Sequence, residues 1–256
     1  MKIRIDKLLV QRGLLPTRER AQAMIIAGRV LVNEQKVSKP GTDVPEDAAV
    51  RLLGYDLRYV SRGGLKLERA LQHWNIDLRG VVCMDVGAST GGFTDCMLQA
   101  GAASVLAVDT GYGQIDAKLR IDARVRLLEK TNARYLEAQQ VPEAIEFIAM
   151  DVSFISAALV LPAVLQAAFA GKRVKCRELV LLVKPQFEVG REHVGKGGIV
   201  RDEKAQFMAL EKIRAAVLEL GGEDVGVIDS PILGTEGNKE FLLHAVFRAQ
   251  QGNRKA

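Results

Sequence analysis

Short apolar runs alternate with helical patterns along most of this 256-residue chain. From residue 61 onward, apolar runs of strand length alternate with longer stretches in which apolar residues recur at helical spacing. This alternation predicts an α/β fold with a mostly parallel, doubly wound sheet. The expected strands span 81–85, 104–109, 125–129, 147–151, 178–183, 225–228 and 241–247, and the expected helices span 66–73, 92–100, 155–169 and 203–220.

The first fifty residues contain shorter elements and predict a separate, small α/β domain. Asp6 is expected to cap a helix that runs through Arg12, and Thr17 to cap a second helix that ends before Gly28. Short strands are expected over 29–33, 36–38 and 49–53. The expected division of the chain is 1–53 for the small domain, 54–60 for a linker and 61–256 for the large domain.

Positive charge is concentrated in the small domain. Residues 1–40 contain nine Lys or Arg and three Asp or Glu, a net charge of +6, although the whole chain carries only +5. Such a concentration indicates a polyanionic partner, the alternative being a solvated surface. Arg18 and Arg20 lie in the first turn of the second expected helix, where the helix dipole disfavours cations. That placement is explained if the two side chains face phosphates.

The cysteine content and the N-terminus indicate a cytoplasmic protein. The number of cysteines is odd and no two are close in sequence, which favours a reducing compartment over a disulfide scaffold or a thiolate metal site. The N-terminus is charged and lacks the apolar core of a signal peptide. The histidines are too widely separated for metal-ligand spacing, so no metal is expected. The cysteines are Cys83, Cys96 and Cys176, and the histidines are His73, His193 and His244.

One segment, 152–171, has no charged residue and is long enough to span a bilayer. It is rich in alanine, contains Pro162, and lies between two expected strands. We therefore expect a buried crossover helix here and no stable membrane association.

The most specific local pattern is a glycine-rich turn after the strand expected at 81–85. Residues 85–94 read Asp-Val-Gly-Ala-Ser-Thr-Gly-Gly-Phe-Thr. The spacing is not the G-x-G-x-x-G of dinucleotide-binding proteins, and G-K-[ST] is absent, which argues against a phosphate cradle. Asp109 ends the next strand, where an acid can bind ribose hydroxyls. A tight turn that serves packing alone is the alternative.

This turn resembles the S-adenosylmethionine-binding pattern of class I methyltransferases, whose fold is Rossmann-like. The resemblance implies that Gly87, Ser89 and Gly91 allow close approach of the methionine part. It also implies that Asp85 faces the sulfonium and Asp109 the ribose. The expected cofactor-binding residues are Asp85, Gly87, Ser89, Thr90, Gly91, Gly92, Phe93, Asp109 and Asn132.

Four ionisable residues lie at positions that suggest chemistry. Asp151 and Lys184 end two expected strands, and open α/β sheets bind ligands beyond the carboxyl ends of their strands. Lys66 follows a pair of glycines, and Glu240 opens the last strand. Burial of Lys184 beside another cation would favour a neutral amine that could act as a base. Taken singly, each residue type at such a position is more often an ordinary surface or ion-pair group, and it is the combination that points to chemistry.

The combined motifs resemble the TlyA family, ribosomal RNA 2′-O-methyltransferases with an FtsJ-like catalytic domain. The small domain resembles the RNA-binding domain of the ribosomal-protein-S-four type. The resemblance covers essentially the whole chain. The segments that carry it are 61–67, 85–94, 150–155, 182–188 and 237–241 for the catalytic domain, and 6–9, 17–21 and 28–33 for the small domain.

The resemblance implies S-adenosylmethionine as cofactor, ribosomal RNA or a ribosomal subunit as partner, and a cytidine 2′-hydroxyl as the methyl acceptor. It also implies a catalytic tetrad in which Lys184 accepts or steers the hydroxyl proton beside Lys66, Asp151 holds the lysines, and Glu240 completes the charge network. In-line attack would make positioning a large part of the acceleration. The expected RNA-binding residues are Arg4, Lys7, Arg12, Arg18, Arg20, Arg29, Lys36 and Arg62.

Several expectations about function stay open at this point. The chain begins close to the small domain, as in the shorter family members, so large-subunit rRNA is the expected target. Residues 57–60 differ from the arginine- and tryptophan-containing linker of mycobacterial members. The loop 187–199 is expected either to close over the target nucleotide or to be a disordered surface loop. The alternative functions are a membrane-active cytolysin and a non-catalytic ribosome-binding factor.

Overall fold

The computed structural model describes residues 2–15, 17–53, 58–170, 174, 176–234 and 237–248. The chain divides into two compact units, Met1–Leu57 and Arg58–Ala256. Each unit has its own hydrophobic core, so each is described by itself.

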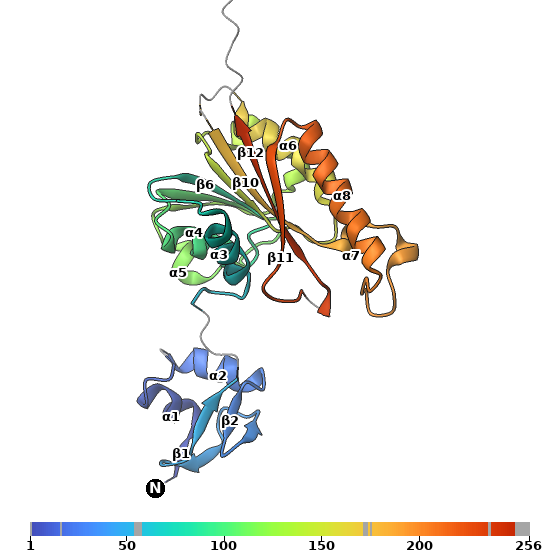
Figure 1. Cartoon of the computed structure of the whole chain (residues 1–256). Coiled ribbons are helices and arrows are strands. Elements are labelled where there is room, and N and C mark those ends of the chain that lie inside the picture. The colour runs from blue at the N-terminus through green and yellow to red at the C-terminus, as the bar shows by residue number, and fades with distance from the viewer. Residues whose placement is uncertain are drawn as a thin grey trace, which may run out of the picture. The chain divides into compact units, whose positions relative to one another are not determined.

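The second unit is built on a seven-stranded sheet with the order β11-β12-β10-β9-β6-β7-β8 (Figure 1). The five strands from β10 to β8 are parallel, while β12 runs antiparallel to both β10 and β11. This confirms the expected mostly parallel sheet. The strands are β6 (Val82–Val86), β7 (Ser104–Val108), β8 (Val125–Leu128), β9 (Phe147–Met150), β10 (Cys176–Val183), β11 (Glu223–Asp229) and β12 (Phe241–Arg248).

Helices cover both faces of this sheet (Figure 1). One face packs against α3 and α4 and the other against α6 and α8, because each of these helices presents an apolar side to its own core cluster. All four expected helices are present, with bounds that differ by up to three residues at the ends. The longer helices are α3 (Gly63–Trp74), α4 (Gly92–Gln99), α6 (Ala157–Phe169) and α8 (Glu203–Glu219).

Short elements between these helices and strands were missed by the sequence pattern. Each is only three or four residues long, which is too short for a helical period to be visible. Two of them, at 185–188 and 191–193, lie in or overlap the loop 187–199, which was expected either to close over the target nucleotide or to be disordered, and Gly195 there also forms a bridge with Ile199. The short elements are α5 (Ala117–Arg120), η1 (Ala133–Tyr135), η2 (Ala138–Gln140), α7 (Pro185–Glu188) and η3 (Arg191–His193).

The first unit combines two helices with two small sheets, β1-β4 and β3-β2-β5. The expected helices and the strands near 30, 36 and 50 are present. The strands β1 and β4 were missed, because the charged residues of Lys2–Arg4 hide a strand whose side chains are only partly buried. The elements are β1 (Lys2–Arg4), α1 (Ile5–Gln11), α2 (Arg18–Ile26), β2 (Val30–Val32), β3 (Gln35–Val37), β4 (Asp43–Pro45) and β5 (Val50–Leu52).

The two expected helix caps have different outcomes. Thr17 does cap α2, since its hydroxyl accepts a hydrogen bond from the Arg20 amide at 3.2 Å. The cap expected from Asp6 is wrong: α1 begins one residue earlier, and the Asp6 carboxylate is fully buried inside the first turn. The carboxylate binds arginine and glutamine side chains, so it is not available to the helix amides.

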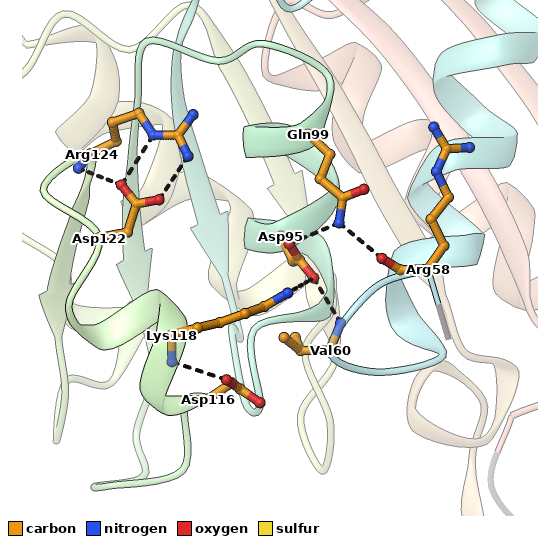
Figure 2. Close-up of polar contacts among 8 residues, drawn as sticks. All are labelled: Arg58, Val60, Asp95, Gln99, Asp116, Lys118, Asp122 and Arg124. Atoms are coloured by element: carbon orange, nitrogen blue, oxygen red, sulfur yellow. Dashed lines mark hydrogen bonds and ion pairs between the residues drawn. The ribbon is translucent and has the colours of Figure 1, made fainter. Parts of the chain in front are cut away.

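The beginning of the second unit is fastened to α4 (Figure 2). Asp95, a buried carboxylate, accepts hydrogen bonds from the Val60 amide at 2.8 Å and from Lys118 Nζ at 3.0 Å. Gln99 connects Asp95 to the Arg58 carbonyl. Of the expected linker, residues 54–57 lie outside the described residues, and residues 58–60 pack against the second unit.

Within the uncharged segment 152–171, the thirteen residues Ala157–Phe169 form α6, whose buried side packs into the core of the second unit. Among the residues that the structure describes, no helix has both the length and the apolar character needed to cross a membrane.

Candidate active site

The four residues of the expected tetrad line one pocket of about 260 Å³ in the second unit. They form two ion pairs there: Lys66 Nζ lies 2.6 Å from Glu240 Oε2, and Lys184 Nζ lies 2.5 Å from Asp151 Oδ1. Lys66, Lys184 and Glu240 are each less than 10% exposed. Residues separated by up to 174 positions in sequence are thus assembled into one buried charge network.

The sheet explains why these residues meet. Asp151 and Lys184 directly follow β9 and β10, two neighbouring parallel strands whose carboxyl ends lie at the same edge. β12 is antiparallel to β10 with Phe241 opposite Val183, so Glu240 enters the sheet at that same edge. Lys66 comes from the first turns of α3. The reversal of the last strand is therefore what brings Glu240 to the pocket.

The pairing within the tetrad differs from the expected arrangement. The family resemblance implied that Lys66 lies beside Lys184 and that Asp151 holds both lysines. In the structure each lysine has its own carboxylate, and Lys184 Nζ also donates to Ser153 Oγ at 2.7 Å. Each ammonium group therefore has a counter-charge at hydrogen-bond distance, as burial of a charge requires.

A second pocket, of about 310 Å³, adjoins the first. The two pockets share Gly87, Ser89 and Asp151 in their walls. Asp109 and Asn132 line the second pocket together with apolar side chains, and no Lys or Arg is among its described lining residues. Two carboxylates, two amide side chains and apolar walls, with no cation among the described lining residues, suit an uncharged nucleoside better than a pyrophosphate. This agrees with the absence of the G-x-G-x-x-G spacing from the turn.

The glycines of the turn are required by close packing. Gly87 has φ +85°, and a Cβ on it would lie 2.3 Å from the Asp151 carbonyl oxygen. A Cβ on Gly92 would lie 2.2 Å from Ser61 Oγ, where the first turns of α3 and α4 meet. Gly87 thus lets the turn lie directly against Asp151, and Gly92 lets α4 begin directly against the segment that leads into α3.

Two expected cofactor contacts are placed elsewhere. Asp85 is fully buried and is absent from the described lining of both pockets, so it does not face them. Its Oδ2 accepts the Thr94 amide at 2.8 Å and the Thr94 hydroxyl at 2.6 Å, beneath the start of α4. Gly91 is also buried, and a Cβ there would lie 2.3 Å from Leu119 Cδ1, so this glycine serves packing.

The remaining expected cofactor residues lie in the pocket walls. Ser89, Thr90, Gly92 and Phe93 line the first pocket. Asp109 accepts backbone hydrogen bonds from Ser89 at 2.8 Å and from Gly111 at 2.6 Å, which fixes its carboxylate at the pocket wall.

Wall residues that the sequence analysis missed come mainly from loops without a recognisable spacing. Ser61, Gly63, Ala88 and the residues after β9 belong to segments that carry the family resemblance, which was a usable signal. The loop before β12 and the residues after β7 offered none. The missed residues are Ser61, Gly63, Ala88, Ile232, Leu233 and Gly234 in the first pocket, and Val108, Thr110, Gln114, Thr131, Ala133, Val152, Ser153, Phe154, Ile155 and Val160 in the second.

Several of the expected RNA-binding arginines are held by the fold of the first unit. Arg4 and Arg18 both bind the Asp6 carboxylate, at 2.9 and 3.1 Å, while 42% and 43% of their side chains remain exposed. Arg12 donates to the Ala48 carbonyl at 2.7 Å. The remaining expected residues form no ion pair within the described part of the chain; they are Lys7, Arg20, Arg29, Lys36 and Arg62. Arg62 lies at the first pocket of the second unit.

The doubly wound sheet and the paired pockets at its carboxyl edge define the class I methyltransferase architecture. Residues 59–247 match the FtsJ-like methyltransferase family, and residues 3–50 match the S4 domain. The chain therefore belongs to the FtsJ-like methyltransferase family, with an S4 domain in its first unit.

Several relatives are similar to this chain over most of their own length. TlyA of Mycobacterium tuberculosis, a 16S/23S rRNA (cytidine-2′-O)-methyltransferase, is 42% identical over 94% of this chain and 89% of its own. YqxC of Bacillus subtilis, named as a candidate rRNA methyltransferase, is 47% identical over 95% of this chain and 85% of its own. A solved structure from Streptococcus thermophilus, described as a candidate hemolysin, is 44% identical with a TM-score of 0.73, covering 96% of this chain and 89% of its own. The expected TlyA-type family is thus confirmed.

Proposed function

We propose that this protein transfers a methyl group from S-adenosylmethionine to the ribose 2′-hydroxyl of a cytidine in ribosomal RNA, with large-subunit rRNA as the substrate. The observation that carries the proposal is the assembly of Lys66, Asp151, Lys184 and Glu240 in one pocket that opens onto a nucleoside-sized neighbour. The named activities of the relatives support the same reaction.

The second pocket would hold the nucleoside part of the cofactor. Asp109 would accept hydrogen bonds from the ribose hydroxyls, and Asn132 lies in the same wall. Ser89, Thr90 and Phe93 would border the methionine part, with Gly87 allowing the backbone to approach. Asp85 and Gly91 would act indirectly, by supporting the turn and the start of α4.

The reaction would take place where the two pockets meet. When bound, S-adenosylmethionine would supply a methyl group whose bond to sulfur breaks as the 2′-oxygen attacks, the electron pair remaining on sulfur. Lys184 would pass a proton to the Asp151 carboxylate with which it is paired, and its Nζ would receive the proton that the hydroxyl loses. Lys66, held by Glu240, would donate a hydrogen bond that orients the 2′-oxygen for in-line attack.

The first unit would supply RNA binding. Its exposed cations, together with Arg4 and Arg18, would neutralise phosphates, which makes binding dependent on salt concentration. We retain 1–53 as the RNA-binding domain and 61–256 as the catalytic domain, joined by 54–60.

A methyl-transfer assay tests this proposal. The full chain is incubated with labelled S-adenosylmethionine and unmodified large or small ribosomal subunits, and the methylated ribose is mapped by primer extension. We expect label in a cytidine of the large subunit, and a loss of at least about a hundredfold in Lys184→Ala. Lys118→Ala, which changes a lysine paired with Asp95 outside both pockets, is the matched control.

Three outcomes would contradict parts of the proposal. No label with either subunit would overturn the enzymatic function and favour a non-catalytic ribosome-binding factor. Full activity in Lys184→Ala would overturn the assigned chemistry. Lysis of vesicles by the purified, cofactor-free chain would favour a cytolysin.

A further inference from the structure

A buried carboxylate outside both pockets joins the two loops that carry the Lys184–Asp151 pair. Glu188 ends α7, four residues after Lys184, and only 2% of its side chain is exposed. Its Oε2 accepts from the Ser156 hydroxyl, and its Oε1 accepts from the Ala157 amide at 2.7 Å. Glu188 thus fastens the segment after β10 to the segment after β9.

The same two segments are joined a second time at the catalytic pair. Lys184 Nζ contacts Asp151 Oδ1 at 2.5 Å and Ser153 Oγ at 2.7 Å. The two loops are therefore joined at two places: residues 151 and 153 contact residue 184, and residues 156 and 157 contact residue 188. A shift of either loop at Glu188 would therefore change the geometry of the pair at the pocket.

Glu188 also takes the place of a helix cap. Ser156 is the N-cap residue of α6, yet its side chain makes no cap hydrogen bond to the helix. The Glu188 carboxylate instead accepts from the first helical amide, where the helix dipole favours negative charge. The start of α6 is thereby fixed by a residue that belongs to the β10 side of the site.

Lys212 of α8 compensates the charge of Glu188. Its Nζ lies 3.1 Å from Glu188 Oε2, 2.8 Å from the Glu188 carbonyl oxygen and 3.2 Å from Ser156 Oγ. Because 45% of the Lys212 side chain is exposed, water can replace part of its contribution. The carboxylate is thus the central member of the cluster, and Lys212 supports it.

From this geometry we infer that Glu188 is a positioning residue for methyl transfer, acting through Ser156 and Ala157 to set the distance between Asp151 and Lys184. The inference rests on the proposed function. It assigns to Glu188 a role in kcat that goes beyond stabilising the fold.

Glu188→Gln is the principal variant, because the amide keeps the volume but can no longer accept from both Ser156 and Ala157 as a carboxylate. We expect kcat to fall about tenfold to a hundredfold, since small misplacements of reacting groups have effects of that size. The KM values for RNA and cofactor are expected to stay within about threefold, because the pocket walls remain. Glu188→Asp should recover only part of kcat, since it restores the charge but not the reach.

Two further variants make the result specific. Lys212→Met should lower kcat less than Glu188→Gln does, because both loop contacts of the carboxylate remain. Glu178→Gln is the matched control: it removes a carboxylate paired with His244 at the beginning of β10, on the opposite end of the strand from Lys184. We expect wild-type kcat in this control.

The outcomes separate this inference from the proposed function. An active wild type with unchanged kcat in folded Glu188→Gln would overturn the positioning role alone. So would an equal fall of kcat in Glu178→Gln, which would indicate a general loss of stability. No methyl transfer by the wild type would contradict the proposed function itself. Hydrogen exchange of 153–157 should increase in Glu188→Gln, and unchanged exchange there would also overturn the inference.

Discussion

Each unit of the molecule contains a fully buried aspartate, and the two carboxylates differ in what surrounds them. Asp6 of the first unit is bound by two arginines and by the Gln22 amide. Asp85 of the second unit is bound only through Thr94, and its Oδ1 has no hydrogen-bond partner among the described residues. Both have zero exposed surface, so burial alone does not distinguish them.

The pKa values of the two carboxylates move in opposite directions. Burial would raise the pKa of Asp6, but hydrogen bonds from Arg4, Gln22 and Arg18 outweigh it and hold the pKa well below its usual range. Burial raises the pKa of Asp85 to about 7, with hydrogen bonds from Thr94 only partly opposing it. The charge and number of the partners decide the ionisation of a buried carboxylate, and this has consequences for each unit.

The largest expected effect is that of Asp6→Asn. The neutral amide cannot hold two guanidinium groups as a carboxylate does, and hydrogen bonds to charged groups contribute about 1.5–3 kcal/mol each. Because both arginines are partly exposed, we expect the first unit to lose about 3 kcal/mol in total. RNA affinity should fall about tenfold, as two phosphate-binding side chains lose their fixed positions.

Hydrogen exchange of residues 2–53 within the full chain measures the stability of the first unit, and filter binding measures RNA affinity. Glu34→Gln is the matched control, because its ion pair with Arg51 is largely exposed and should contribute less than about 1 kcal/mol. Equal losses of stability in the two variants would show that burial of Asp6 does not strengthen its ion pairs.

The next effect is the response of the second unit to pH. The folded pKa of Asp85 lies above its unfolded value, so between about pH 4 and pH 7 the folded state binds more protons. Stability must then fall as the pH rises through this range, by about 2–3 kcal/mol between pH 5 and pH 8. Asp85→Asn should remove most of this dependence.

Trp74, the single tryptophan of the chain, lies in the second unit and reports its urea unfolding by fluorescence. The stability of the first unit depends on pH in the opposite direction. The lowered pKa of Asp6 stabilises the folded unit above about pH 4, and this stability is lost as the pH falls below that value. A second unit whose stability does not change between pH 5 and pH 8 would contradict an elevated pKa at Asp85.

A smaller loss of stability is expected from Thr94→Val, which changes one partner of the Asp85 carboxylate. It removes the hydroxyl that donates to Asp85 at 2.6 Å but keeps the backbone amide. We expect a loss of about 1 kcal/mol, as is typical of one hydrogen bond, and a higher midpoint for the pH dependence. Thr110→Val, an exposed threonine, is the control. A lower midpoint in Thr94→Val would show that the hydroxyl does not stabilise the ionised carboxylate.

The same contrast explains how far the sequence could predict this molecule. The strands and long helices follow from apolar periodicity, and the tetrad is implied by the family resemblance, with Asp151 and Lys184 also marked by their positions at strand ends. The partner of each buried charge does not follow, because it depends on which strands become neighbours. Glu240 was identified, yet its pairing with Lys66 required the antiparallel entry of β12. Asp85 was assigned to the cofactor because its sequence position cannot reveal that its carboxylate points beneath α4.

Lys118→Met should have the smallest effect. Asp95 is buried like Asp6 and Asp85, but its cationic partner Lys118 is 56% exposed and reaches it from α5 at 3.0 Å (Figure 2). Water can solvate the ammonium in either state, and Asp95 keeps hydrogen bonds from Val60 and Gln99.

We therefore expect less than about 0.5 kcal/mol of lost stability by Trp74 fluorescence, and cofactor affinity within about twofold. If exposure of the partner limits its contribution, removing Lys118 must matter far less than removing the charge of Asp6. A loss above about 2 kcal/mol would show instead that a single half-exposed lysine stabilises a buried carboxylate as strongly as two arginines.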